Sequence, residues 1–405
     1  MVSGPTRLPW CVLILTIGLS ACTKVAATPP EMGRRLTRSA LPAPEAGLPA
    51  AFVDLRIEKL ALAWNEVLDS PGVGELGGPL HTSSWRDLLD FYDGRVAFKR
   101  VFRADEGLGP TFNDVSCASC HSAPVIGGGG ADMAQGITVH GPPWTGGDAM
   151  GLRKHAIEGV EKERAAGKTA RLRTPPLFGL GLLDQVSEQD RQRLEDPEDR
   201  NGDGIRGRRG YRNGEGQQRP SRFGQKANDW DLRTFLAGAL VDEMGVTNTA
   251  RREPRADSDA VADPEVSEVF IDRLDAYVRQ LAPPQRGPST PSSLKGRQLF
   301  AEIGCTGCHK AQLGPVKGAF TDLLLHDMGP SLDSGLKDGV ATGAMWRTAP
   351  LWGLRHRKRY THDERAASIA EVMALHLGEA KGPSRRFLGL PQADQAAIIA
   401  FLNTL

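Results

Sequence analysis

Apolar residues recur at helical spacing in several separate stretches of the chain. From Phe52 to Leu68 they fall at the three- and four-residue intervals that place them on one helix face. Similar patterns predict helices over Leu232–Met244, Val266–Leu281 and Gln392–Leu405. The apolar face of the last one consists of Ile398, Phe401, Leu402 and Leu405. No sustained alternation of apolar and polar residues argues for more than an occasional hairpin.

Two short motifs place two cysteines and a histidine in the same order. They are Cys117-Ala-Ser-Cys120-His121 and Cys305-Thr-Gly-Cys308-His309. C-x-x-C-H is typical of a c-type haem, in which two thiols add to the vinyl groups and the histidine reaches the iron. A four-thiolate zinc site or a dithiol redox pair are alternatives, but neither explains the histidine after each second cysteine. The sequence therefore predicts two covalently bound haems c.

The segment Asp90–Phe102 leads into the first motif. Its side chains Phe98, Val101 and Phe102 are expected to pack on the porphyrin. After the motif, the run Gly127–Gly130 would allow a close approach to the haem edge or form a mobile loop.

A proline-rich linker, 282–291, precedes the second motif. Ser292 or Ser293 can cap the helix that follows it. We therefore predict an N-terminal cytochrome c-like domain over 51–285 and a C-terminal one over 291–405.

An internal repeat follows each motif. Arg173-Thr-Pro-Pro-Leu-Phe-Gly-Leu180 and Arg347-Thr-Ala-Pro-Leu-Trp-Gly-Leu354 agree at six of eight positions. We expect each half of the chain to attach a haem and then fold a proline-containing turn back over it.

Composition narrows the fold class. The 405 residues include 47 glycines and 28 prolines but only 6% aromatic residues. These values favour a mainly α fold: short helices wrapped on porphyrins in two cytochrome c-like haem domains with loop-rich insertions. The net charge of +1 does not point to a nucleic acid partner.

The N-terminus resembles an export signal. Arg7 precedes the apolar run Leu8–Leu19, and Leu19-Ser20-Ala21-Cys22 resembles a bacterial lipoprotein box. Residues 1–21 would then be removed, Cys22 would carry lipid, and 22–50 would form a flexible tether. An ordinary signal peptide with a chance cysteine is the alternative. Either interpretation places the protein in the periplasm, and lipidation would anchor it, we expect to the outer membrane, without a spanning helix.

Residues 185–229 are charged and glycine-rich and are expected to form a surface excursion. Within them, the side chains Asp199, Asn201 and Asp203 match the front half of a calcium loop. The twelfth position is Gly210 rather than glutamate, so calcium and a simple Asx-rich turn both remain open.

Several further segments occur together with the motifs and repeats. These segments are Gly107-Leu-Gly-Pro-Thr-Phe-Asn113, 221–227, 244–248, 324–329 and 376–380. In this combination the chain resembles the di-haem cytochrome c peroxidase superfamily, and within it the di-haem oxidoreductases labelled "thiol oxidoreductase". Gln225 and Glu364 depart from the resemblance, because tryptophan and glycine are expected there. No cysteine is left to form a thiol pair.

The resemblance implies different roles for the two haems. The C-terminal haem would be six-coordinate and relay electrons, whereas the N-terminal haem would meet the substrate. The second axial ligand of the C-terminal haem lies one helix beyond a turn that corresponds to Tyr360-Thr-His-Asp363. That position is His376, with Met328 and Met373 as alternatives.

The resemblance also suggests residues near the N-terminal haem. His140 corresponds to a distal loop histidine, and Glu243 to a distal acid that moves a proton between the oxygens of peroxide. A solvated histidine and a surface carboxylate are the alternatives. The side chains that could relay electrons, or simply fill the core, are Trp144, Trp230, Trp346 and Trp352.

Three functions fit the sequence: a peroxidase-like oxidoreductase, a pure electron-transfer cytochrome, and an enzyme that oxidises a protein or organic substrate. The expected partners are a small redox protein, such as a cytochrome or cupredoxin, and peroxide or another small substrate.

Overall fold

The computed structural model describes residues 66, 70–141, 149–165, 167–214, 217–251 and 259–405. All of them belong to one compact unit, 57–405. Several predicted features lie outside the residues described. They are the signal segment, the tether, Trp144 and the Phe52–Leu68 helix except for Glu66. Across the described ranges, no helix is long and apolar enough to cross a membrane.

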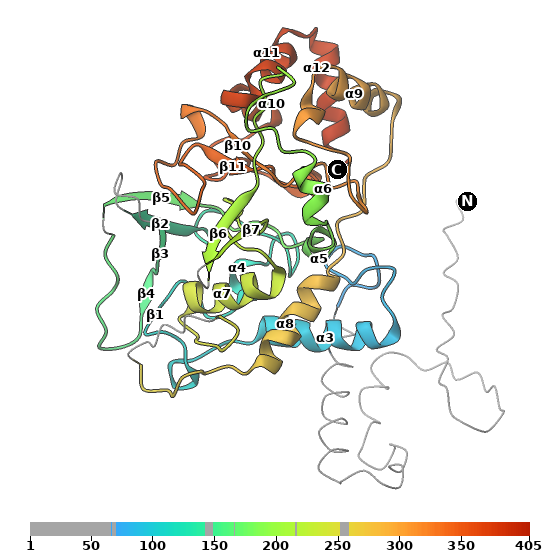
Figure 1. Cartoon of the computed structure of the whole chain (residues 1–405). Coiled ribbons are helices and arrows are strands. Elements are labelled where there is room, and N and C mark those ends of the chain that lie inside the picture. Colours follow the sequence, from blue (N-terminus) through green and yellow to red (C-terminus); the bar gives the residue numbers. More distant parts are fainter. Residues whose placement is uncertain (1–65, 67–69, 142–148, 166, 215–216, 252–258) are drawn as a thin grey trace, which may run out of the picture. The chain divides into compact units, whose positions relative to one another are not determined.

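Two pairs of helices organise the chain (Figure 1). In the first half, α3 (Trp85–Lys99) packs on α8 (Glu268–Gln280). In the second half, α9 (Pro291–Glu302) packs on α12 (Gln392–Leu402). The apolar face predicted for the last helix is buried, at Ile398, Phe401, Leu402 and Leu405.

Each helix pair crosses at a glycine. A Cβ atom at Gly94 would lie 2.2 Å from the Arg273 carbonyl oxygen, and one at Gly296 would lie 1.8 Å from that of Ala397. The two backbones therefore touch at each crossing, which only glycine permits.

We expect Gly296→Ala to lower the free energy of unfolding by about 1–3 kcal/mol or more, because its methyl group has no space at the crossing. Chemical denaturation would measure the change. Gly389→Ala is the matched control, since Gly389 ends helix α11 (Lys381–Gly389) and a methyl group added there would have nothing within 4 Å. The control should be neutral or slightly stabilising. Equal losses of stability in both variants would contradict the crossing argument.

The two repeats occupy matching places. Gly179 has φ 72° and donates its N–H to the Leu281 carbonyl oxygen at 2.9 Å. Gly353 has φ 75° and donates to the carbonyl oxygen of Leu405 at 3.0 Å. Each repeat therefore turns back against the end of the second helix of its own half.

Among the remaining described helices, only α7 (Leu232–Met244) is as long as those of the two pairs. The others are α4 (Cys117–Cys120), α5 (Leu180–Asp184), α6 (Glu188–Gln192) and α10 (Ile369–Leu375). Single 3-10 turns cover 104–106, 305–307, 330–332, 354–356 and 378–380. Helix α7 has the predicted bounds, and α8 is slightly shorter than predicted.

The cap of α9 differs from the prediction. Thr290 is the N-cap, and its side chain accepts the N–H of Ser293 at 3.1 Å. The Ser293 hydroxyl in turn accepts the N–H of Thr290 at 2.8 Å. This reciprocal pair is a capping box, so the helix begins earlier, at Pro291, and neither Ser292 nor Ser293 is the cap.

The strands in the described part of the chain all pair in antiparallel fashion. The middle strand β2 (Ile137–Gly141) lies between β3 (Met150–Leu152) and β5 (Lys168–Leu172). The two-stranded sheets are β1 (Thr111–Phe112) with β4 (His155–Ala156), β6 (Gly210–Gly214) with β7 (Gln217–Ser221), β8 (Gln312–Leu313) with β9 (Val316–Lys317), and β10 (Leu325–Asp327) with β11 (Met345–Arg347). The three-stranded sheet is more than the occasional hairpin that the sequence predicted. The prediction missed it because buried and exposed positions do not alternate along β2.

Two sequence-based expectations about exposure are wrong. Phe98 and Phe102 are buried, but Val101 is 58% exposed because α3 has already ended at Lys99. The region 185–229 is not a surface excursion throughout. Arg191 within it is fully buried, and its guanidinium donates to the Ser221 carbonyl oxygen at 2.6 Å.

The linker 282–291 is hydrogen-bonded to both halves of the chain. The N–H of Gly287 donates to the carbonyl oxygen of Thr404 at 2.7 Å, and the Gln285 side chain donates to that of Gly74 at 2.9 Å.

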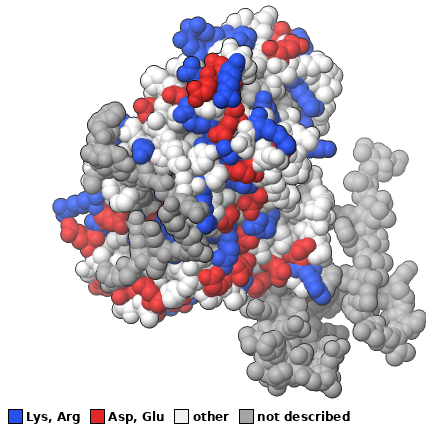
Figure 2. Space-filling model, viewed as in Figure 1, with Lys and Arg blue, Asp and Glu red and all other residues white. Residues whose placement is uncertain are grey.

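On the face drawn in Figure 2, positive and negative side chains are interspersed over the described surface.

Candidate functional site

The second motif follows directly after helix α9. Gly304 starts the 3-10 turn Cys305–Gly307 in left-handed backbone, with φ 89°. Beyond it, the Nδ1 atom of His309 lies 2.9 Å from the Phe320 carbonyl oxygen and must donate its hydrogen there. Burial foremost, and secondarily the nearby His376, lowers the pKa of His309 to about 4. The neutral ring therefore keeps its Nε2 lone pair for a metal.

A cavity of about 290 Å³ opens beside this motif. Its wall includes Cys305, Cys308 and His309 and all three predicted candidates for the sixth ligand, namely His376, Met328 and Met373. His376 ends helix α10, and its Nδ1 donates to the Val372 carbonyl oxygen at 2.7 Å. His376 therefore presents Nε2 in the same tautomer as His309, which favours it over the two methionines.

The first motif forms helix α4, capped by Ser116. The Nδ1 atom of His121 donates to the Gly128 carbonyl oxygen at 3.0 Å, and burial lowers the pKa of this histidine to about 4. A Cβ atom at Gly128 would lie 2.0 Å from the carbonyl oxygen of Ala123. The glycine run thus packs closely against Ala123 and orients His121, and its approach to the haem edge stays a prediction.

The four motif cysteines are half-buried, and the pKa of each thiol is raised. Burial raises the pKa of Cys117, Cys120 and Cys305 to about 12, and it also raises that of Cys308. None of the described cysteines forms a disulfide. Among the described residues, the only close group of three metal-ligating side chains is Cys308, Asp322 and His326. The two cysteine pairs do not converge, so the structure does not support a four-thiolate zinc site.

Glu243 lies near the first motif, at the end of helix α7. Its charge is one of those that raise the pKa of Cys120, after burial and Asp114. The Asn113 side chain donates to Glu243 Oε2 at 2.6 Å, and the Asn113 backbone N–H donates to the Glu243 carbonyl oxygen at 2.6 Å. Burial raises the pKa of Glu243 to about 7, in spite of the hydrogen bond from Asn113. This carboxyl group can therefore gain or lose a proton near neutral pH.

His140 lies on the middle strand β2 rather than in a loop. It is buried, and it pairs with Met150 on one side and Thr169 on the other. The prediction of a loop histidine is therefore wrong about its backbone, because β2 is held between two neighbouring strands.

A family model described as "Di-haem oxidoreductase, putative peroxidase" matches residues 160–405. The chain belongs to this family. The family name implies two haem cofactors. The matched residues include the second motif, whereas the first motif precedes them and rests on its own C-x-x-C-H pattern and geometry.

Three solved structures resemble this di-haem oxidoreductase. Hydrazine synthase of Kuenenia stuttgartiensis, pressurised with xenon, is 14% identical, with 95% of this chain and 100% of that chain covered and a TM-score of 0.39. The diheme peroxidase BthA of Burkholderia thailandensis is 16% identical, with 77% and 85% covered and a TM-score of 0.43. A MauG-like protein associated with microbial copper homeostasis is 14% identical, with 83% and 93% covered and a TM-score of 0.34. No curated protein sequence matches the chain.

We expect His376→Ala to change the second haem of this oxidoreductase from low-spin to high-spin, because the variant would lose the imidazole that we predict to be the sixth ligand. His376→Met should remain low-spin with a higher reduction potential. Optical and EPR spectra with a redox titration measure both effects. Met373→Leu is the control and should keep the parent spectrum. A low-spin His376→Ala protein would show that another side chain is the ligand.

The described tryptophans have different surroundings. Trp352 lines the cavity beside the second motif, which is called the second cavity below. It also contacts the first repeat, since a Cβ atom at Gly179 would lie 2.4 Å from its ring. Trp346 stacks on His362, with the ring centroids 3.9 Å apart, and Lys226 Nζ lies 3.6 Å from its centroid. Trp352 therefore touches both halves of the oxidoreductase, and an electron-relay role stays a prediction.

The residues proposed for calcium form an exposed turn. Asp199 Oδ1 accepts the N–H of Gly204 at 3.0 Å, Asn201 Oδ1 accepts that of Asp203 at 3.0 Å, and Asp203 Oδ1 accepts that of Ile205 at 2.8 Å. The bonds of Asn201 and Asp203 each reach two residues on, as in Asx turns, whereas the bond of Asp199 spans five residues. Calcium binding stays a prediction.

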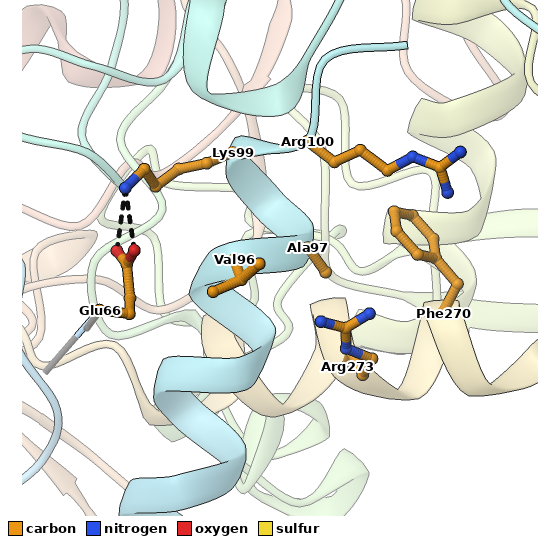
Figure 3. Close-up of a pocket in the computed structure, with 7 residues that line it drawn as sticks. All are labelled: Glu66, Val96, Ala97, Lys99, Arg100, Phe270 and Arg273. Carbon is orange, nitrogen blue, oxygen red and sulfur yellow. Dashed lines mark hydrogen bonds and ion pairs between the residues drawn. The ribbon is translucent and has the colours of Figure 1, made fainter. Parts of the chain in front are cut away.

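A separate hollow of about 380 Å³ lies between α3 and α8 (Figure 3). Glu66 and Lys99 form an ion pair of 3.0 Å in its wall, and the Arg100 guanidinium lies 5.6 Å from the centroid of the Phe270 ring. None of the haem-motif residues lines this hollow. It is therefore not a haem site.

Sequence reasoning missed a buried hydrogen-bond network in the wall of the cavity beside the second motif. His326 donates to Asp322 Oδ2 at 2.9 Å and to Glu379 Oε2 at 2.8 Å. Although burial opposes it, these carboxylates raise the pKa of His326 well above its usual value. Glu379 also accepts the N–H of Asp327 at 2.9 Å. The network therefore holds the segment that follows His376. The only sign of it in the sequence was that His326 and Glu379 lie in the segments 324–329 and 376–380, which carry the family resemblance.

Proposed function

We propose that this protein is an exported di-haem c-type oxidoreductase that reduces peroxide, or another small oxidant, at its first haem. The second haem relays the electrons. The observation that carries the proposal is the difference between the two sites. The first motif has Glu243 beside it with a pKa near 7, whereas the second motif shares its cavity with His376, whose Nε2 is available.

The residues fit two covalent haems. Cys117 and Cys120 would hold the first haem, and Cys305 and Cys308 the second. The proximal imidazoles come from His121 and His309, whose Nδ1 hydrogens are both engaged by carbonyl oxygens. When bound, the haems supply the electron transfer that peroxide reduction needs.

Glu243 supplies the proton movement. Reduction of hydrogen peroxide to two waters takes two electrons and two protons, and cleavage of the O–O bond requires a proton on the departing oxygen. Oε2 of Glu243 is occupied by the Asn113 donor, so Oε1 is the atom that accepts a proton and returns it. A pKa near 7 leaves both forms populated at neutral pH.

Several finer features belong to the same proposal. The matched helix pairs support two mainly α, cytochrome c-like domains, 51–285 and 291–405. The apolar run before Cys22 supports export and lipid anchoring in the periplasm, at the outer membrane. The electron donor would be a small cytochrome or cupredoxin.

Spectra of the ferric protein before and after peroxide test the proposal. The protein would be made in a host with cytochrome maturation machinery. We expect one low-spin haem, one haem that changes with peroxide, and turnover with an artificial electron donor. A wholly low-spin protein that ignores peroxide would instead indicate a pure electron-transfer cytochrome. Peroxide-dependent oxidation of an added protein or organic substrate would indicate the third function.

A further inference from the structure

Two arginines in the wall of the second cavity lack full partners. Arg173 belongs to the first repeat and Arg357 follows the second, and both line the cavity. The Nε atom of each is buried and has no hydrogen-bond acceptor among the described residues. Glu364 Oε1 lies 3.7 Å from Arg173 Nε, which is an ion pair but too long for a hydrogen bond. A buried N–H group without an acceptor is unfavourable, so the Nε atoms of these side chains are suited to an anion.

The wall also carries surplus positive charge. Burial foremost, and next the charge of Arg173, lowers the pKa of Arg357 to about 9, which places the two guanidinium groups near each other. Within the described part of the chain, Glu364 is paired with Arg173 alone. Of the other ionisable side chains of the wall, Glu379 is paired with His326, and Arg347 donates to the carbonyl oxygen of Gly224 at 2.9 Å.

We propose that Arg173 and Arg357 bind the propionate carboxylates of the haem attached at Cys305 and Cys308. This inference rests on the proposed function only in requiring a haem in this cavity. A c-type haem is attached along its vinyl edge, and its two propionates project from the opposite edge. Guanidinium groups match carboxylates because they donate two parallel hydrogen bonds.

Arg173 belongs to the first half of the chain but would bind a propionate of the second haem. Its N–H donates to the His362 carbonyl oxygen at 2.7 Å, and its Nη1 donates to that of Arg359 at 3.0 Å. Gln225 donates to the Arg173 carbonyl oxygen at 2.9 Å. The propionates would therefore tie the first repeat to the second half of the chain.

Glu364 tunes this site in this particular chain. It stands where glycine is expected from the resemblance, and its φ of 59° is in the left-handed region. Its carboxylate lies beside Arg173 and offsets part of the positive charge. Both departures from the family pattern, Gln225 and Glu364, thus contact Arg173.

The reduction potential of the second haem tests the assignment. Arg173→Gln and Arg357→Gln remove positive charge, so each should lower the potential by favouring the ferric form. We expect at least a tenfold change in the reduction equilibrium, or about 59 mV for one electron. Glu364→Gln should raise the potential. Resonance Raman bands of the propionates should change in both arginine variants.

Two further variants keep the test decisive. Arg357→Lys should retain most of the potential but change the propionate bands, since lysine keeps the charge without the planar donors. Arg359→Gln is the control, because its side chain is exposed, and it should match the parent. Parent-like potentials and bands in both Arg→Gln variants would overturn the proposal.

A free anion at the same site would give a different result. In that case, added inorganic phosphate would shift the potential of the parent protein but not that of Arg357→Gln, and the propionate bands would stay constant. This outcome would also overturn the proposal. None of these measurements uses peroxide turnover, and haem content measured after denaturation shows separately whether the second haem is attached.

Discussion

Glu243→Gln should lower peroxide turnover by a factor of about 10² to 10⁴, the usual contribution of a general acid–base group. Glutamine keeps the shape of the side chain and an oxygen that accepts the Asn113 hydrogen bond, but it cannot carry a proton. The loss should therefore appear in the chemical step. Steady-state assays with an artificial donor, together with stopped-flow mixing with peroxide, would measure it.

Asp242→Asn provides the control for this substitution. Asp242 is the preceding residue, its side chain is 42% exposed, and it pairs with Arg251 at 2.5 Å. Because its charge also helps to raise the pKa of Glu243 after burial, the variant should show nearly parent turnover with a slightly lower pH optimum. Parent-like activity in Glu243→Gln would remove this residue from the mechanism.

The pH dependence of the reaction should report Glu243 directly. To accept a proton it must begin as the carboxylate, so turnover should rise as the pH passes about 7. Asn113→Ala removes a hydrogen bond that favours the carboxylate, so the pKa should rise and the rising limb should move to higher pH. A limb that moves to lower pH, or stays in place, would contradict this arrangement.

The same pKa affects stability. The folded value lies above the ordinary 4.5, so the folded protein holds this proton more tightly than the unfolded chain. The stabilising contribution of the protonated form is complete below about 4.5 and is lost as the pH rises through about 7.

Replacing Cys305 and Cys308 together with alanine should remove one of the two covalent haems. The denatured variant should keep half of the iron–porphyrin absorbance and lose the mass of one haem. Stability should also fall by several kcal/mol, since a 290 Å³ cavity costs about 24 cal/mol per Å³ if it is left empty. Such a loss is comparable with the total stability of many domains.

The corresponding replacement of Cys117 and Cys120 is the comparison. It should also remove one haem, and the two variants should differ in which spectral component disappears. A parent protein that is colourless after denaturation, or that contains zinc in place of iron, would contradict the attachment of haem at both motifs.

Local features of the chain were largely predictable. Helix α7 has the predicted bounds, and the apolar face of α12 is buried as expected. Helical periodicity depends on residues within a few positions of one another, which is why it can be recognised in a single sequence. The cap at Thr290 was missed because several neighbouring hydroxyl residues could each have served as the cap, and only the backbone distinguishes them.

The sheet and the buried charges were not predictable in this way. Strand β2 carries His140 between two other strands, but its residues do not alternate in burial. Arg191 lies in a strongly charged stretch, yet it is fully buried against the backbone of Ser221. A charged composition predicts exposure only on average, and partners far along the chain can reverse it.

The sequence alone predicts the chemistry of attachment from two C-x-x-C-H motifs, each followed by a matching repeat. The two cysteines and the histidine of each motif lie within five consecutive residues, so their spacing can be recognised without the fold. Folding was required to bring Asn113 to Glu243, 130 positions away, and to place Arg173 of the first repeat in the cavity of the second motif. Such pairings arise from packing between distant segments, and no short-range pattern encodes them.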